Sequence, residues 1–156
     1  MDYAAAMGIA LEEAGSALVH GDIPIGAVVL VDGDVIARRH NERENLGDPT
    51  AHAELLAVRD AALALDNGWR LERATVVVTV EPCSMCAGSL IAARVDRLVF
   101  GAFDPKAGAC GSVYNLCADP RLNHEVDVVS GVRADEATSL LDAFFAGLRA
   151  GERPDR

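Results

Sequence analysis

Two short segments of the chain carry side chains that commonly bind metal ions. Cys83 and Cys86 lie three residues apart in PCSMC, directly after the Val-rich stretch ATVVVTV. His52 and Glu54 lie two residues apart in TAHAE. Alone, a Cys-x-x-Cys pair fits a redox pair, half of a structural zinc site or a chance occurrence. A lone His-x-Glu pattern is also common by chance, so the interpretation depends on the two segments together.

Together, the two segments supply the ligands of a catalytic zinc site. His52, Cys83 and Cys86 are three protein ligands, which leaves the fourth zinc position open for water. Bound zinc lowers the pKa of water to about 7 and so makes hydroxide available at neutral pH. Glu54 can then shuttle a proton to a substrate nitrogen and to the leaving group. This is hydrolytic deamination, and the combined pattern is the signature of zinc nucleobase deaminases.

A closed structural zinc site is the alternative interpretation. Cys110 or Cys117 could supply a fourth ligand, and the protein would then be a zinc-stapled binding module without turnover. Otherwise we expect both cysteines to be small buried residues. His20 and His40 are expected to be surface or helix-cap residues.

The elements that must position these side chains follow from periodicity and turn residues. Apolar residues at helical spacing predict a helix over about 2–20, and IGAVVLV and VIARR, separated by Asp32-Gly33-Asp34, predict a hairpin. NERENLGDP is expected to be a polar loop. Thr50 is the expected N-cap of a helix that begins at about Ala51 and stops at Asn67-Gly68.

The second half of the chain alternates strands with helices. ATVVVTV predicts a buried strand, and the chain is expected to turn into the helix SMCAGSLIAARV at Glu81-Pro82. RLVFG and the region near VDVVSG predict two further strands, and a last helix is expected over about 134–149. Strands that alternate with helices predict an α/β sandwich.

Length and composition favour one soluble domain. A chain of 156 residues predicts a single domain over 1–156. We expect no signal peptide and no membrane span, because the longest apolar runs are too short to cross a bilayer. A cytoplasmic location follows as the expectation, and it favours metal-bound or buried thiols over disulfides.

The net charge of -10 argues against sequence-independent binding to nucleic acid, which depends on many phosphate contacts from Lys and Arg. Specific binding to one RNA loop is compatible with this charge if basic residues gather on one rim. The chain contains a single lysine. The candidates for such a rim are Lys106, Arg121, Arg149, Arg153 and Arg156.

With these motifs located, the sequence resembles the cytidine deaminase superfamily, and more closely the bacterial tRNA-specific adenosine deaminases. The first two motifs mark only the superfamily, whereas the segments after Cys86 favour the tRNA enzymes. The resemblance covers most of the chain and implies a three-layer α/β/α sandwich with a mixed five-stranded sheet. It runs through DIPIGAVVL, DPTAHAELLAVR, TVEPCSMCAG, LVFGAFDPKAGACGS, LNHEVDVVSGV and LLDAFFAGLR.

The resemblance also implies a function: conversion of adenosine to inosine at the wobble position of a tRNA anticodon loop, by a homodimer with one Zn²⁺ per subunit. It assigns the zinc to His52, Cys83 and Cys86 and the proton transfers to Glu54. A deaminase of a free base or nucleoside, such as guanine, cytosine or cytidine, is the alternative that suits the acidic surface. The implied substrate-binding residues are Asn41, Ala53, Ile25, Val28, Asp104, Lys106, Asn123, His124, Phe145 and Arg149.

Overall fold

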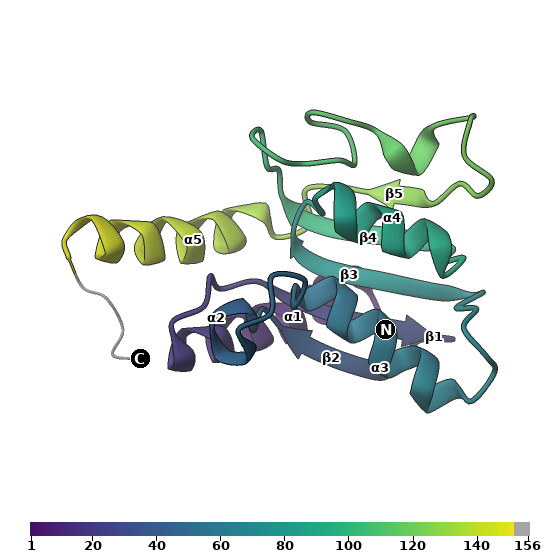
Figure 1. Cartoon of the computed structure of the whole chain (residues 1–156), viewed down its shortest axis with the longest axis horizontal. Coiled ribbons are helices and arrows are strands. Elements are labelled where there is room, and N and C mark those ends of the chain that lie inside the picture. Colours follow the sequence, from purple (N-terminus) through teal and green to yellow (C-terminus); the bar gives the residue numbers. More distant parts are fainter. Residues whose placement is uncertain (152–156) are drawn as a thin grey trace.

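The computed structural model describes residues 1–151, and its centre is a mixed five-stranded sheet with the strand order β2-β1-β3-β4-β5 (Figure 1). β1 pairs antiparallel with both β2 and β3, whereas β3, β4 and β5 are parallel. The mixed sheet predicted from the resemblance is therefore confirmed. The strands are β1 (Gly26–Val31), β2 (Asp34–His40), β3 (Ala74–Val80), β4 (Arg97–Ala102) and β5 (Asp127–Val129).

The hairpin of β1 and β2 closes through Asp32 and Gly33, whose φ angles are 53° and 88°. Two-residue hairpin turns need such positive φ angles, which Asp tolerates and Gly adopts freely. This turn fixes the position of β2 beside β1. As a result, the end of β2 lies next to the start of β1, where His40 pairs with Gly26.

Helices cover both faces of the sheet and complete the expected three layers (Figure 1). On one face, α3 and α4 pack on a cluster that includes Val76, Val78 and Phe100. On the other face, α1 packs on Val28, Leu30, Val77 and Val99, and α5 contacts α1, β3 and β4. The helices are α1 (Tyr3–Ala17), α2 (Arg43–Leu46), α3 (Ala53–Leu65), α4 (Ser84–Ala92) and α5 (Ala134–Arg149), with short 3-10 turns η1 (Leu18–His20) and η2 (Leu116–Ala118).

Two local predictions differ from the structure around α3. The segment expected to be a polar loop contains the short helix α2. Thr50 does not cap α3, because its hydroxyl and its backbone amide both donate to Asp48 Oδ1 at 2.8 Å. The N-cap is His52, and the helix ends at Asp66 in the left-handed conformation. None of the helices within residues 1–151 combines the length and the hydropathy that a membrane span requires.

Candidate active site

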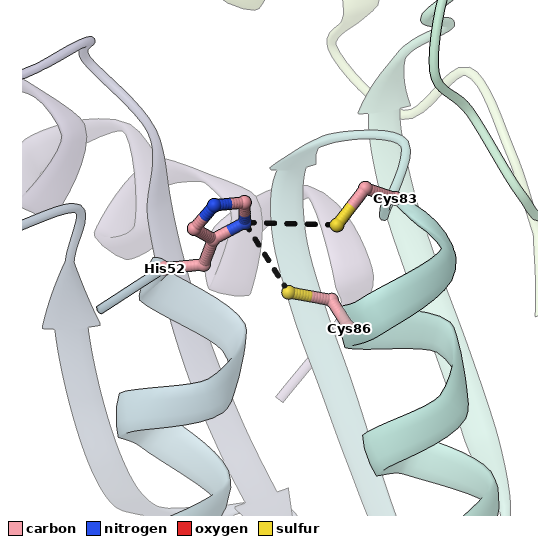
Figure 2. Close-up of side chains that lie close together, drawn as sticks. All are labelled: His52, Cys83 and Cys86. Atoms are coloured by element: carbon pink, nitrogen blue, oxygen red, sulfur yellow. Dashed lines mark hydrogen bonds between the residues drawn. The ribbon is translucent and has the colours of Figure 1, made fainter. Parts of the chain in front are cut away.

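The zinc-binding motifs meet at one edge of the sheet, where β3 and β4 end and β1 begins. His52 is the N-cap of α3, and Cys83 is the N-cap of α4, with Cys86 in the first turn of that helix. Both helices thus point their N-termini at the same place, as Figure 2 shows for the three side chains. Helix N-termini carry partial positive charge and favour thiolates.

The three donor atoms fit a tetrahedral zinc ion. His52 Nδ1 lies 3.7 Å from Cys83 Sγ and 3.5 Å from Cys86 Sγ (Figure 2). Zinc bonds of about 2.05 Å to nitrogen and about 2.3 Å to sulfur place these atoms about 3.6 Å apart at a tetrahedral angle. Among the described residues, these three ligands form one group whose donor atoms lie within 4.8 Å of one another. The set matches the three-ligand arrangement of a catalytic zinc site.

Burial and hydrogen bonding shift the pKa values of Cys83 and Glu54. The hydrogen bond from Cys86, followed by that from His52, lowers the pKa of Cys83 to about 3, so Cys83 is a thiolate at neutral pH. The side chain of Glu54 is only 4% exposed. Burial raises the pKa of this carboxyl above its usual value. A thiolate ligand therefore lies beside a carboxyl group that holds a proton more readily than an exposed one.

A cavity of about 210 Å³ opens onto these groups. This volume is below the roughly 300–1,000 Å³ of typical small-molecule pockets, so it suits one base rather than a large ligand. The lining combines apolar side chains with the catalytic candidates, and we call it the active-site cavity. It is lined by Ile23, Ile25, Asn41, Arg43, His52, Ala53, Glu54, Val80, Glu81, Cys83, Asp104 and Ala107.

Asn41 offers a free acceptor in the active-site cavity. Its backbone amide donates to Ile25 O at 3.0 Å and its side-chain Nδ2 donates to Ile23 O at 3.3 Å. These bonds fix the orientation of the amide. Oδ1 is buried and has no hydrogen-bond partner within residues 1–151. An unpaired buried acceptor is costly, so a bound ligand that donates to Oδ1 would be favoured.

Four of the predicted substrate-binding residues line the active-site cavity, namely Ile25, Asn41, Ala53 and Asp104. Val28 does not line it. Side chains alternate between the two faces of a strand, and Val28 packs with α1 on the face away from the zinc ligands. The structure thus places Val28 in the core.

The remaining predicted residues lie outside the active-site cavity. Lys106 is exposed in the loop after β4, and Phe145 and Arg149 are exposed on α5. His124 Nε2 lies 2.7 Å from Val95 O, and Asn123 accepts a bond of 3.5 Å from the Arg94 guanidinium.

The proposed basic rim is only partly described by the structure. Arg121 is paired with Asp119 at 2.6 Å. Lys106 follows β4 and Arg149 ends α5, so the two belong to separate elements. Arg153 and Arg156 lie outside the described residues.

Sequence reasoning missed Glu81, which is 3% exposed. Its carboxylate accepts hydrogen bonds from the backbone amides of Asp104 at 3.0 Å, Cys110 at 3.1 Å and Ser112 at 2.9 Å. Burial alone would raise the pKa of Glu81, but these bonds, led by that from the Ser112 hydroxyl, lower it. Glu81 therefore holds the loop after β4 against the active-site cavity. An acidic residue between a buried strand and Pro82 was the available signal.

Cys110 and Cys117, the possible fourth ligands of a structural zinc site, contact each other. Cys110 Sγ is 3.6 Å from Cys117 Sγ, and both residues are buried, as expected. Within residues 1–151, the donor group around His52 includes neither of them.

The prediction for His20 and His40 is wrong, because both are half-buried and their rings face each other, with centroids 5.3 Å apart.

Known proteins are similar to this chain in sequence. Residues 1–102 match the family described as cytidine and deoxycytidylate deaminase zinc-binding region. The chain is 48% identical to a tRNA-specific adenosine deaminase of Bacillus subtilis over 94% of this chain and 91% of that protein. It is 41% identical to the protein of the same name in Aquifex aeolicus, over 90% of this chain and 92% of the other.

Solved structures of deaminases are also similar to this chain. A structure from a study of A-to-I editing by tRNA:A34 deaminases superimposes with a TM-score of 0.84 and 44% identity, over 88% of this chain and 99% of that chain. The guanine deaminase from Nitrosomonas europaea has a TM-score of 0.80 and 27% identity, over 92% of this chain and 84% of that chain. Both are similar over nearly the whole described structure.

Proposed function

The chain belongs to the cytidine and deoxycytidylate deaminase family, and we propose that it is a zinc-dependent tRNA adenosine deaminase. It converts adenosine to inosine at the wobble position of an anticodon loop. The observation that carries this proposal is the 48% identity to a tRNA-specific adenosine deaminase over 94% of the chain, because that identity extends far beyond the zinc motifs.

Glu54 carries the proton transfers in this proposal. When bound to His52, Cys83 and Cys86, zinc would act as a Lewis acid that lowers the pKa of water to about 7. Water adds to C6 of adenine, the C6–N6 bond breaks, and ammonia leaves. Glu54 takes the proton from the attacking water, passes one to N1 and protonates the departing N6. Its burial supports this role, because a raised pKa makes Glu54 a stronger base towards the attacking water than an exposed carboxylate would be.

Asn41 and the start of α3 position the base. The free Oδ1 of Asn41 accepts a hydrogen bond from the purine, while the backbone at Ala53 and the side chain of Ile25 shape the cavity around the ring. Asp104 also lines the active-site cavity. These assignments require only that one unpaired base enters the active-site cavity. Nucleobase deaminases generally reach the target base in this way.

The RNA flanking the base contacts residues beyond the active-site cavity. Lys106, Asn123 and His124 contribute polar contacts, and exposed Phe145 beside Arg149 offers a surface for stacking on unpaired bases. Neutralisation of Lys106 or Arg149 should weaken binding of an anticodon stem-loop more steeply at low salt than at high salt.

We further propose that the enzyme is a cytoplasmic homodimer and that residues 1–156 form one catalytic domain. The four long helices α1, α3, α4 and α5 pack on a single sheet, which supports the one-domain assignment. Sedimentation of the purified chain should give a mass near twice 16.4 kDa. A mass that stays at 16.4 kDa across micromolar concentrations would contradict the dimer.

The deciding experiment offers the purified protein an arginine anticodon stem-loop with adenosine at the wobble position. Free guanine, cytosine and cytidine are assayed in parallel. We expect inosine in the RNA and no ammonia from the small substrates. The second candidate, a deaminase of a free base, is favoured by the similarity to guanine deaminase and by the small cavity. Ammonia from guanine with unchanged RNA would select it.

A variant of Glu54 distinguishes an enzyme from a zinc-stapled binding module. Glu54→Gln should retain zinc and lose deamination by at least ~100-fold, because only the proton shuttle is removed. His52→Ala, in contrast, should lose the zinc itself. Metal analysis and inosine assays on both variants test this pair of expectations, and full activity in Glu54→Gln would remove Glu54 from the mechanism.

A further inference from the structure

A second group of metal-ligating side chains lies beside the active-site cavity. His20 ends η1, His40 ends β2, and Glu42 precedes α2. One donor atom from each of these residues lies within 4.8 Å of the other two. All three residues are partly buried, with side-chain exposures of 20%, 21% and 13%. We call this group the His20/His40 cluster.

Both imidazole rings are held through Nδ1 by a carboxylate. His20 Nδ1 lies 2.7 Å from Asp22 Oδ2, and His40 Nδ1 lies 2.8 Å from Glu13 Oε2. Asp22 is itself fixed, because it is 1% exposed and accepts the backbone amides of Glu44 and Asn45. A carboxylate that accepts Nδ1–H leaves the lone pair of Nε2 for another partner, and this is the usual arrangement of metal-binding histidines.

The second ring nitrogen of His20 lacks such a partner. His20 Nε2 is buried, and no hydrogen-bond partner for it exists within residues 1–151. Buried polar atoms are normally satisfied, and each exception calls for an explanation such as an ion. Nothing in the deamination mechanism uses this atom, since His20 does not line the active-site cavity.

Glu42 can supply the third ligand without leaving a charge unpaired. Its carboxylate accepts hydrogen bonds from Arg39 and, at 3.1 Å, from Asn45 Nδ2. Arg39 also donates to Asp60 at 2.7 Å, so the guanidinium keeps a carboxylate partner if Glu42 turns towards a cation.

The charge around the cluster favours a cation. Three carboxylates, those of Glu13, Asp22 and Glu42, face the two imidazoles. The two guanidinium groups nearby, Arg38 and Arg39, pair with Glu13 and Glu42. One negative charge therefore remains in excess.

From this arrangement we propose that His20, His40 and Glu42 bind a second divalent metal ion, distinct from the ion at His52, Cys83 and Cys86. Two histidines and a glutamate are an established three-ligand set for zinc. Asn41 lies between His40 and Glu42 in the chain and lines the active-site cavity. An ion here links η1, β2 and α2 and so fixes the backbone that carries Asn41.

The test is a Zn²⁺ titration of the purified enzyme that already contains one zinc per chain, followed by native mass spectrometry and metal analysis. Wild type should take up a second equivalent. His20→Asn and His40→Asn should remain at one equivalent. Asp22→Asn should bind the second ion about 10–100-fold more weakly, because it replaces the carboxylate partner of His20 with a neutral amide. His124→Asn is the matched control, since this half-buried histidine lies outside both groups, and it should still bind two.

Cobalt separates the two sites by their ligands. Co²⁺ at the His52 site has thiolate ligands and gives sulfur-to-metal charge-transfer absorption, whereas Co²⁺ at the His20/His40 cluster gives none. We expect a second Co²⁺ equivalent to bind without further charge-transfer intensity. If the histidine variants fail to fold, ¹⁵N spectra of the wild-type imidazoles replace them: Zn²⁺ should shift Nε2 of His20 and His40 and leave His124 unchanged. Saturation of wild type at one equivalent, or equal loss in His124→Asn, would overturn the proposal.

Discussion

At the scale of single residues, the site combines groups whose roles differ because their surroundings differ. Cys83 is a thiolate because Cys86 and His52 donate to it. Glu54 and Glu81 are both buried carboxyls, yet burial raises the pKa of Glu54 whereas several hydrogen bonds lower that of Glu81. The first carboxyl therefore suits proton transfer and the second suits a permanent structural anion.

The free acceptor of Asn41 leads to a prediction about the base. Asn41→Ala should lower kcat/KM for the anticodon stem-loop by about 10-fold, because one hydrogen bond to a buried group is worth about 1–1.5 kcal/mol. Zinc content should stay at the wild-type value. Asn67→Ala, at an exposed asparagine after α3, should leave kcat/KM unchanged. Wild-type kinetics in Asn41→Ala would show that Oδ1 does not contact the substrate.

The lowered pKa of Glu81 predicts how stability depends on pH. A carboxylate whose pKa is lower in the folded state stabilises the fold above its unfolded pKa of about 4.3, and this contribution is lost as pH falls through the folded pKa. At pH 7, Glu81→Gln should be less stable by about 1–3 kcal/mol, since its amide cannot accept all the bonds. Urea unfolding of both proteins should show this gap narrowing below pH 4. A constant gap at all pH values would refute the assignment.

At the scale of elements, the active-site cavity depends on how closely the loop after β4 approaches the end of β3. A Cβ atom on Gly108 would lie 2.4 Å from the Glu81 carboxyl and 2.5 Å from Asp104 O. The glycine is therefore required by this close contact. Asp104, whose backbone amide donates to Glu81 at 3.0 Å, lines the active-site cavity together with Glu81.

Substitution of this glycine tests the coupling between loop and cavity. Gly108→Ala should reduce kcat/KM by at least ~10-fold, because the Glu81 carboxylate and the loop must separate, and zinc should be retained. The matched control is Gly15→Ala in α1, where an added Cβ meets nothing within 4 Å. There, alanine should slightly stabilise the helix. Equal activity in the two variants would mean that the loop does not position the active-site cavity.

At the scale of the whole molecule, zinc ties together helices that pack on the same face of the sheet. The ligands come from the starts of α3 and α4, and the hydrophobic cluster beneath these helices is large. A second cluster under α1 covers the other face. We therefore expect the core to support the fold without the ion, unlike a small zinc finger, which unfolds when its metal is removed.

Removal of zinc should consequently lower the melting temperature without abolishing cooperative unfolding. A ligand present at 1,000 times its Kd adds about 4 kcal/mol, which corresponds to about 8–16 °C for a domain of this size. Calorimetry before and after chelation measures the difference, and stoichiometric zinc should restore it. A chelated protein with no thermal transition would show that the core alone is insufficient.

The amino-acid sequence alone was enough to predict the candidate zinc ligands, the order of the main elements and the three-layer fold. These depend on local information: His52, Cys83 and Cys86 have distinctive ligand chemistry, and apolar periodicity with turn residues marks each strand and helix. Even the last helix, Ala134–Arg149, begins and ends where the pattern predicts.

The faces and partners of the remaining residues became clear from the three-dimensional structure. Val28 lies on the far side of the sheet because the register of β1 turns it towards α1. Glu81 finds its partners in a loop brought alongside by the parallel pairing of β3 and β4. His20 and His40 face each other because the β1–β2 hairpin places the end of β2 beside η1. Such contacts join residues that are distant in the chain, so local sequence patterns do not predict them.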